Sequence, residues 1–128
     1  MLPQSVVLRK ENNLLYWKNT SFKISVEDAK TVAAEVLKLA QRPEITLMLV
    51  DNRGAKGGAW PQDVNPIWSE LMGNLAKHIE KSATVADVTV VMQINRLSKT
   101  SGTLEQVQAF EDIQQAKTFL GVSQLPIE

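Results

Sequence analysis

One short segment concentrates the side chains that could bind an anion or a protein partner. It runs from Asp51 to Trp60 and contains one carboxylate, two cationic side chains, three glycines and a tryptophan. Glycine-rich turns before a helix can bind anions through backbone N–H groups, and nearby cations strengthen that binding. The segment has neither the Gly-Lys-Ser/Thr ending of a P-loop nor the Gly-x-Gly-x-x-Gly pattern of dinucleotide sites. The candidate binding residues are Asp51, Arg53, Gly54, Lys56, Gly57, Gly58 and Trp60.

The same segment also has a purely structural interpretation. Glycines supply positive backbone φ angles in loops, and an aspartate that follows a strand often caps local N–H groups. Trp60 is either an exposed anchor for a partner or a lid that packs on the core. Loss of stability in Trp60→Ala would identify a lid, whereas an unchanged melting temperature would favour an anchor. Trp17 and Trp68 are predicted in or beside the core.

A second polar cluster lies further along the chain and includes the last candidate binding residue, Arg96. It continues with Lys99, Thr100 and Ser101. These side chains could bind an anion or a protein carboxylate, or they could cap and solvate a helix. In a parallel sheet the cluster would lie near the same edge as Asp51.

The sequence contains no recognisable catalytic or metal-binding pattern. His78 is the single histidine and follows Leu71 by seven residues, which predicts a packed or hydrogen-bonded side chain on the apolar face of a helix. We find no His-Glu-x-x-His motif, no paired acids and no nucleophile elbow. We therefore predict no catalytic residue, no metal and no cofactor.

Hydrophobic patterning predicts a single α/β domain. Its mostly parallel, mixed sheet has about five strands with an antiparallel opening pair, packed with about four helices. We expect the domain to cover residues 1–128, with a core at 5–121 and a tail at 122–128. The expected strands are 5–10, 12–18, 45–50 (buried on both faces), 85–94 and 107–110. The expected helices are 26–40 after a Ser25 cap, 66–81 after a loop at 51–65, a short stretch at 96–101, and 113–120 before Gly121.

Composition narrows the classes of partner and the cellular setting. Fourteen basic and fourteen acidic residues leave no net charge to attract nucleic acid. No cysteine is present, which excludes disulfides and thiolate metal sites and fits a cytoplasmic setting. No apolar run is long enough to span a membrane, and the first residues do not have the pattern of a signal peptide.

The ordered motifs resemble the STAS-like domains, typified by the anti-sigma-factor antagonists, and especially their SpoIIAA-like relatives. Residues 47–54 (Leu-Met-Leu-Val-Asp-Asn-Arg-Gly) are similar to the family's strand that ends in Asp-x-x-Gly. Residues 95–102, which lead to 107–110, and the closing helix from residue 113 are also similar to the family. Classical members carry a phosphorylatable serine after the central strand. Residues 51–68 contain no Ser, Thr or Tyr, and Ser69 projects away from the apolar stripe of its helix.

The resemblance implies a non-catalytic regulatory or protein-interaction module, here without the usual phosphorylated serine. We expect the partner to be another protein, and a homodimer is compatible with the sequence. The alternative is a domain that binds a small anion, nucleotide or lipid with the loop and helix start at 51–68. The sequence does not name the partner or the ligand.

Overall fold

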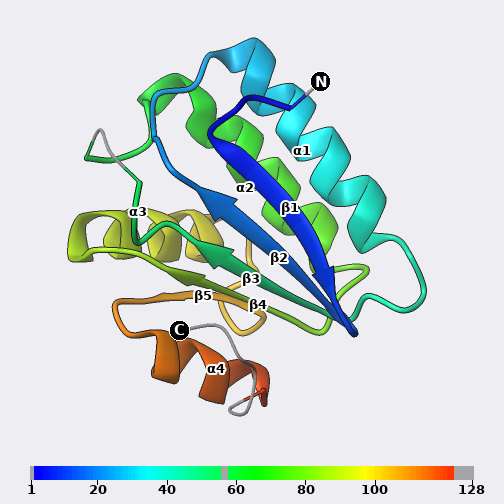
Figure 1. Ribbon diagram of the computed structural model, residues 1–128. Helices are drawn as coiled ribbons and strands as arrows, with labels where there is room; N and C mark the ends of the chain where they lie inside the picture. Colours follow the sequence, from blue (N-terminus) through cyan, green and yellow to red (C-terminus); the bar gives the residue numbers. More distant parts are fainter. Residues whose placement is uncertain (1, 56–57, 123–128) are drawn as a thin grey trace.

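The computed structural model describes residues 2–55 and 58–122. Its centre is a five-stranded sheet in which the spatial order of the strands is the order of the chain (Figure 1). The first two strands are antiparallel, and every later strand is parallel to its predecessor. The strands are β1 (Val6–Glu11), β2 (Leu14–Asn19), β3 (Leu47–Asp51), β4 (Lys81–Val85) and β5 (Val107–Phe110).

The tight turn between β1 and β2 explains the antiparallel pair. Asn12 has a φ of 55° between β1 and β2, a conformation that asparagine tolerates better than most residues. Farther along, β3 lies in the middle of the sheet and all five of its residues are buried. These features confirm the predicted opening pair and the predicted buried central strand.

Four helices cover the sheet on two faces. They are α1 (Val26–Ala40), α2 (Asn65–Leu75), α3 (Val88–Thr100) and α4 (Ile113–Leu120). The larger core cluster joins α1, α2 and α3 to one face of the sheet, and the smaller cluster joins α4 to the other face (Figure 1). Successive right-handed crossovers in one direction place their helices on one side of a sheet, which explains why α1, α2 and α3 share a face.

Side-chain caps set the start of several helices. The Ser25 side chain accepts a hydrogen bond from the backbone N–H of Asp28 and confirms the predicted start of α1. Asp87 accepts from the N–H of Val90 at the start of α3. Gly121, with a φ of 76°, ends α4 as predicted.

The structure corrects the predictions for the chain between β3 and β5. Helix α2 ends at Leu75, residues 76–80 form a turn and a short connection, and Lys81, predicted as the end of the helix, is the first residue of β4. The predicted strand at 85–94 is wrong because Val85 is the last residue of β4 and α3 begins at Val88. The separate helical stretch at 96–101 is the C-terminal part of α3 and its cap.

The strand at 85–94 was predicted because the segment is rich in β-branched side chains, and its helical periodicity was given less weight. Val90, Ile94 and Ser98 recur every fourth residue and form the buried stripe of α3. The true strand, Lys81–Val85, carries a serine and a threonine and therefore lacks a strand's usual apolar pattern. Most of the predicted tail, residues 123–128, lies outside the described residues.

Candidate binding sites

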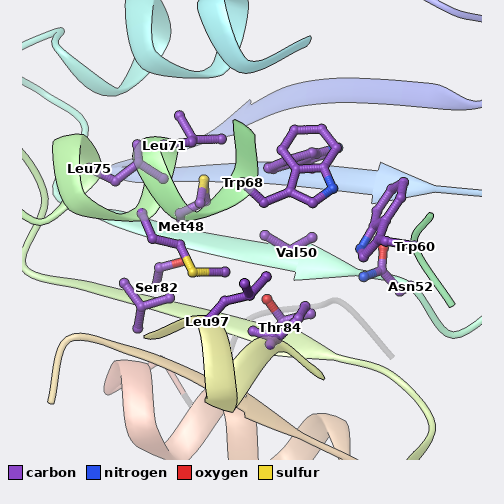
Figure 2. A pocket seen from close by; sticks show the side chains of 14 residues that line it. Met48, Val50, Asn52, Trp60, Trp68, Leu71, Leu75, Ser82, Thr84 and Leu97 are labelled. Carbon is purple, nitrogen blue, oxygen red and sulfur yellow. The ribbon is translucent and has the colours of Figure 1, made fainter. Parts of the chain in front are cut away.

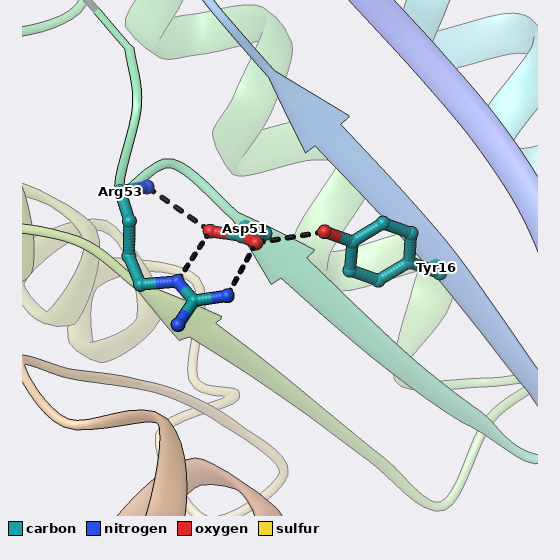
Figure 3. A network of polar contacts seen from close by, with 3 residues as sticks. All are labelled: Tyr16, Asp51 and Arg53. Carbon is teal, nitrogen blue, oxygen red and sulfur yellow. Dashed lines mark hydrogen bonds and ion pairs between the residues drawn. The ribbon is translucent and has the colours of Figure 1, made fainter. Parts of the chain in front are cut away.

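Asp51 forms a hydrogen-bonded cluster with Tyr16 and Arg53 at the carboxyl end of β3 (Figure 3). The Tyr16 hydroxyl donates to Asp51 Oδ2 at 2.7 Å. The Arg53 side chain donates through Nε to Oδ1 at 3.0 Å and through Nη2 to Oδ2 at 2.9 Å, and its backbone N–H donates to Oδ1 at 3.1 Å. A carboxylate accepts about four hydrogen bonds. The acceptor positions of Asp51 are therefore filled.

These contacts shift the pKa values of the whole cluster. Burial alone would raise the pKa of Asp51, but the hydrogen bonds from Arg53 and Tyr16 outweigh burial and hold it below its usual value. Burial, followed by the hydrogen bond and the negative charge of Asp51, raises the pKa of Tyr16 to about 12. Hydrogen bonding to Asp51 raises the pKa of Arg53. A fully bonded carboxylate of low pKa is a poor general base near neutral pH, so this arrangement favours a structural clip for the loop after β3.

Trp60 closes the other end of that loop as a lid on the core. Its side chain is buried, with ring centroids 4.8 Å from Phe22 and 5.1 Å from Trp68 in edge-on geometry. The amide of Gln93 holds its backbone: Oε1 accepts from the Trp60 N–H at 3.3 Å, and Nε2 donates to the Trp60 carbonyl at 3.2 Å. Trp60 is therefore not available as an exposed anchor.

The structure separates the remaining candidates. Gly58 has a φ of 83° and fits the structural interpretation of the glycines, whereas Gly54 has no such requirement. Lys56 and Gly57 lie outside the described residues, so anion binding by this loop stays a prediction. Arg96 is exposed on α3 and lines the same hollow as Trp60, but Asp51 and Arg53 do not line it.

The predictions for the other two tryptophans and for His78 have different outcomes. Trp17 and Trp68 are buried, as predicted, and pack edge-on with their ring centroids 5.5 Å apart. His78, in contrast, is exposed in the turn after α2, because the helix ends before reaching it. The prediction of a packed histidine on the apolar face is wrong.

A cavity lies between the sheet and the pair α2 and α3, beneath Trp60 (Figure 2). Its volume is about 40 Å³. Side chains from β3, β4, α2 and α3 line it, and most of them are apolar. Sequence analysis missed the polar residues at this cavity, Asn52, Ser82 and Thr84, because their positions depend on strand pairing and on a strand that was not predicted.

Comparison with protein-family models gives a match to the SpoIIAA-like family over residues 19–121. The chain belongs to the SpoIIAA-like family. Among solved structures, it is similar to an uncharacterised DUF3478-family protein from Shewanella loihica PV-4, whose crystal structure has a SpoIIAA-like fold. The two share 16% sequence identity with a TM-score of 0.60 over 90% of this chain and 91% of that chain, a likeness that shows the fold alone. No curated protein matches the chain.

In residues 2–55 and 58–122, no three or more His, Cys, Asp or Glu side chains are grouped so as to hold a metal ion. Within the same ranges, no helix combines the length and apolarity needed to cross a membrane.

Proposed function

We propose that this chain is a non-catalytic module that binds a protein partner through the exposed surface of α3. The observation that carries the proposal is that one exposed apolar side chain, Met92, lies between two hollows in the surface. Met92 is 60% exposed and lines both of them. Val88 lies one helical turn earlier and is 52% exposed, while Arg96 lies one turn later. We call Val88, Met92 and Arg96 the α3 ridge.

The two hollows give a partner a shaped surface on either side of the ridge. The first, of about 340 Å³, lies between α3 and the end of the 51–65 loop, where Gln62 and Asn65 form part of its wall. The second, of about 550 Å³, is open and lies toward Leu104, a residue that is 39% exposed. Exposed apolar side chains beside concave surface are typical of protein interaction sites.

The charge of this surface indicates the chemistry of the partner. Arg96 and Lys99 line the hollows, and among residues 2–55 and 58–122 no acidic side chain does so. In the described part of the chain, neither cation forms an ion pair with a carboxylate. A partner segment that combines apolar side chains with Asp or Glu would complement both properties.

Family membership supports the proposed class of function. STAS-type domains, to which the SpoIIAA-like fold is related, typically interact with other proteins. The surface that we propose differs from the one that the sequence suggested, because Trp60 is buried and the loop contributes through Ala59, Gln62 and Asn65. Residues 51–68 contain no hydroxyl side chain, so the proposal includes no phosphorylated serine in this segment.

Site-specific photocrosslinking tests this proposal. The sequence has no cysteine, so one introduced cysteine can be labelled uniquely. Met92→Cys and the control Val7→Cys, at another exposed apolar residue on β1, are labelled with benzophenone maleimide and irradiated in an extract of the source cell. We expect a protein adduct from Met92→Cys that is absent from Val7→Cys.

A charge reversal provides the second arm of this test. Arg96→Glu, added to Met92→Cys, should abolish the adduct because the acidic partner is repelled. Arg42→Glu makes the same replacement at an exposed position after α1 and should preserve it. Three results would contradict the proposal. They are the same adduct from both labelled positions, an adduct that still forms with Arg96→Glu, and an adduct with a second copy of this chain.

A further inference from the structure

The cavity beneath Trp60 contains polar atoms that the protein itself does not satisfy. Asn52 Nδ2, Trp68 Nε1 and Ser82 Oγ are buried and lack a hydrogen-bond partner within the described residues. All three residues line the cavity, and their exposed fractions are 3%, 4% and 1%. Native proteins rarely leave buried donors unpaired, because their desolvation is then uncompensated.

The orientation of the Asn52 amide follows from a chain of hydrogen bonds. The Trp17 indole can only donate, and its Nε1 lies 2.9 Å from Asn19 Oδ1. The Asn19 amide must therefore present Nδ2 to its other neighbour, Asn52 Oδ1, at 2.7 Å. The Asn52 oxygen is thereby occupied, and its NH2 group is left as a donor. These two hydrogen bonds hold the Asn52 NH2 group as a donor at the cavity even without a ligand.

The donors have a definite place in the cavity. Figure 2 shows Asn52 and Trp68 at the end near Trp60, with Ser82 toward the other end, near Met48 and Leu75. The parallel pairing of β3 with β4 explains this separation, because Ser82 is opposite Met48 near the start of the strands, whereas Asn52 follows the end of β3. The apolar middle is made by side chains such as Val50, Leu71 and Leu97.

The lining also indicates the charge of a ligand. None of the described residues that line the cavity is a Lys, Arg, His, Asp or Glu. An ionised ligand would lose its hydration there without gaining a counterion, which is strongly unfavourable. The available volume holds about three water molecules. The site therefore fits a small neutral molecule.

We propose that this cavity binds a small neutral organic molecule with an apolar body and one carbonyl oxygen. The oxygen accepts hydrogen bonds at the end formed by Asn52 and Trp68, and the carbon chain lies between α2, α3 and the sheet. A carbonyl oxygen suits this end because it has two lone pairs and offers no donor. The proposal concerns the interior of the domain and does not depend on the α3 ridge.

Matched probes test the proposal on the full chain. Acetone is small enough for this cavity and is the expected ligand type, 2-methylpropene has the same shape without the acceptor, and acetate replaces the ketone with a charged group. The readout is the indole N–H signal of Trp68 in 15N-correlated NMR spectra, where the three tryptophans give separate indole signals. We expect acetone to shift the Trp68 signal in a saturable way and to bind roughly tenfold more tightly than 2-methylpropene. Acetate should produce no saturable shift.

Two variants locate the binding. Trp68→Phe keeps an aromatic ring but removes the donor, and it should weaken acetone binding roughly tenfold without weakening binding of the alkene, as measured by thermal shift. Ser82→Val fills part of the cavity and should weaken both probes. Thr118→Val makes a similar hydroxyl-to-methyl change at an exposed residue of α4 and should weaken neither.

Several outcomes would overturn the proposal. Equal binding of all three probes would show that the donors do not select the ligand. An unshifted Trp68 signal, with water cross-peaks to its indole N–H in the presence of excess acetone, would show that the cavity holds only water. If Trp68→Phe does not fold, Ser82→Val still provides a test. Probe binding by Ser82→Val that equals wild-type binding would reject the site.

Discussion

Tyr16 is the one tyrosine of the sequence, and its hydroxyl connects two parallel strands by donating to Asp51. Its pKa of about 12 lies above the value of about 10 expected in an unfolded chain. The folded state therefore retains the phenol proton more strongly than the unfolded state. The resulting stability is fully present below pH ~10 and is lost as the pH rises toward 12.

A spectroscopic titration measures this property directly. After rapid pH jumps, phenolate absorbance should show Tyr16 half ionised near pH 12 in the folded protein and near pH ~10 in urea. Asp51→Asn should lower the folded pKa, because it removes a hydrogen-bonded negative charge while burial continues to raise it. An ordinary pKa in the folded wild-type protein would contradict the Tyr16–Asp51 contact.

At the residue scale, sequence analysis identified side chains by type and position but not by partner. Asp51 could be found because it follows an apolar run. Asn19 and Asn52 could not, because their contact joins residues 33 positions apart and requires the pairing of β2 with β3. Arg53 was predicted as a possible anion ligand, yet it donates to the nearest carboxylate.

At the element scale, the prediction succeeded where one face of a segment is consistently apolar. Helix α1 shows this in Ala29, Val32 and Val36. The prediction failed at β4, whose Ser82 and Thr84 line the cavity, so the residues that give that cavity its polarity also concealed the strand. Because valines favour strands, the valines of α3 then led to the incorrect prediction of a strand at 85–94.

The start of α3 offers a test of this correction. Asp87→Ala removes the side chain that accepts from the Val90 N–H and should lower the free energy of unfolding by about 1 kcal/mol. Asp63→Ala is the control at an exposed residue of the 3-10 turn Gln62–Val64, and it should change stability by less than about 0.5 kcal/mol. Urea denaturation measures both. Equal effects would argue against a helix that begins at Val88.

At the scale of the whole molecule, Trp60 joins parts of the chain that are distant in sequence. It packs on Phe22 before α1 and on Trp68 in α2, and Gln93 of α3 bonds to its backbone. Sequence analysis left the anchor and the lid open for Trp60, because an aromatic residue in a loop carries no periodic pattern. The class of the sheet, in contrast, followed from the alternation of strands and helices.

Truncation of this side chain should have a large effect. Trp60→Ala should lower the free energy of unfolding by about 3–5 kcal/mol, because it leaves a cavity over the core. Trp60→Phe preserves part of the packing and should lose less. Leu104→Ala, at an exposed apolar residue, should change stability by less than about 0.5 kcal/mol. A melting temperature that is unchanged in Trp60→Ala would contradict the lid.

Because strand order in the sheet equals strand order in the chain, each strand finds its neighbour already made during synthesis. The sheet can therefore add strands at one edge while the chain leaves the ribosome N-terminus first. No strand has to wait for a later strand to be inserted beside it. The face that carries Tyr16 and Leu49 is the exception, because α4, which packs on that face, emerges last. Nascent chains that lack α4 therefore expose this apolar face and are the intermediates for which we expect a chaperone to be needed.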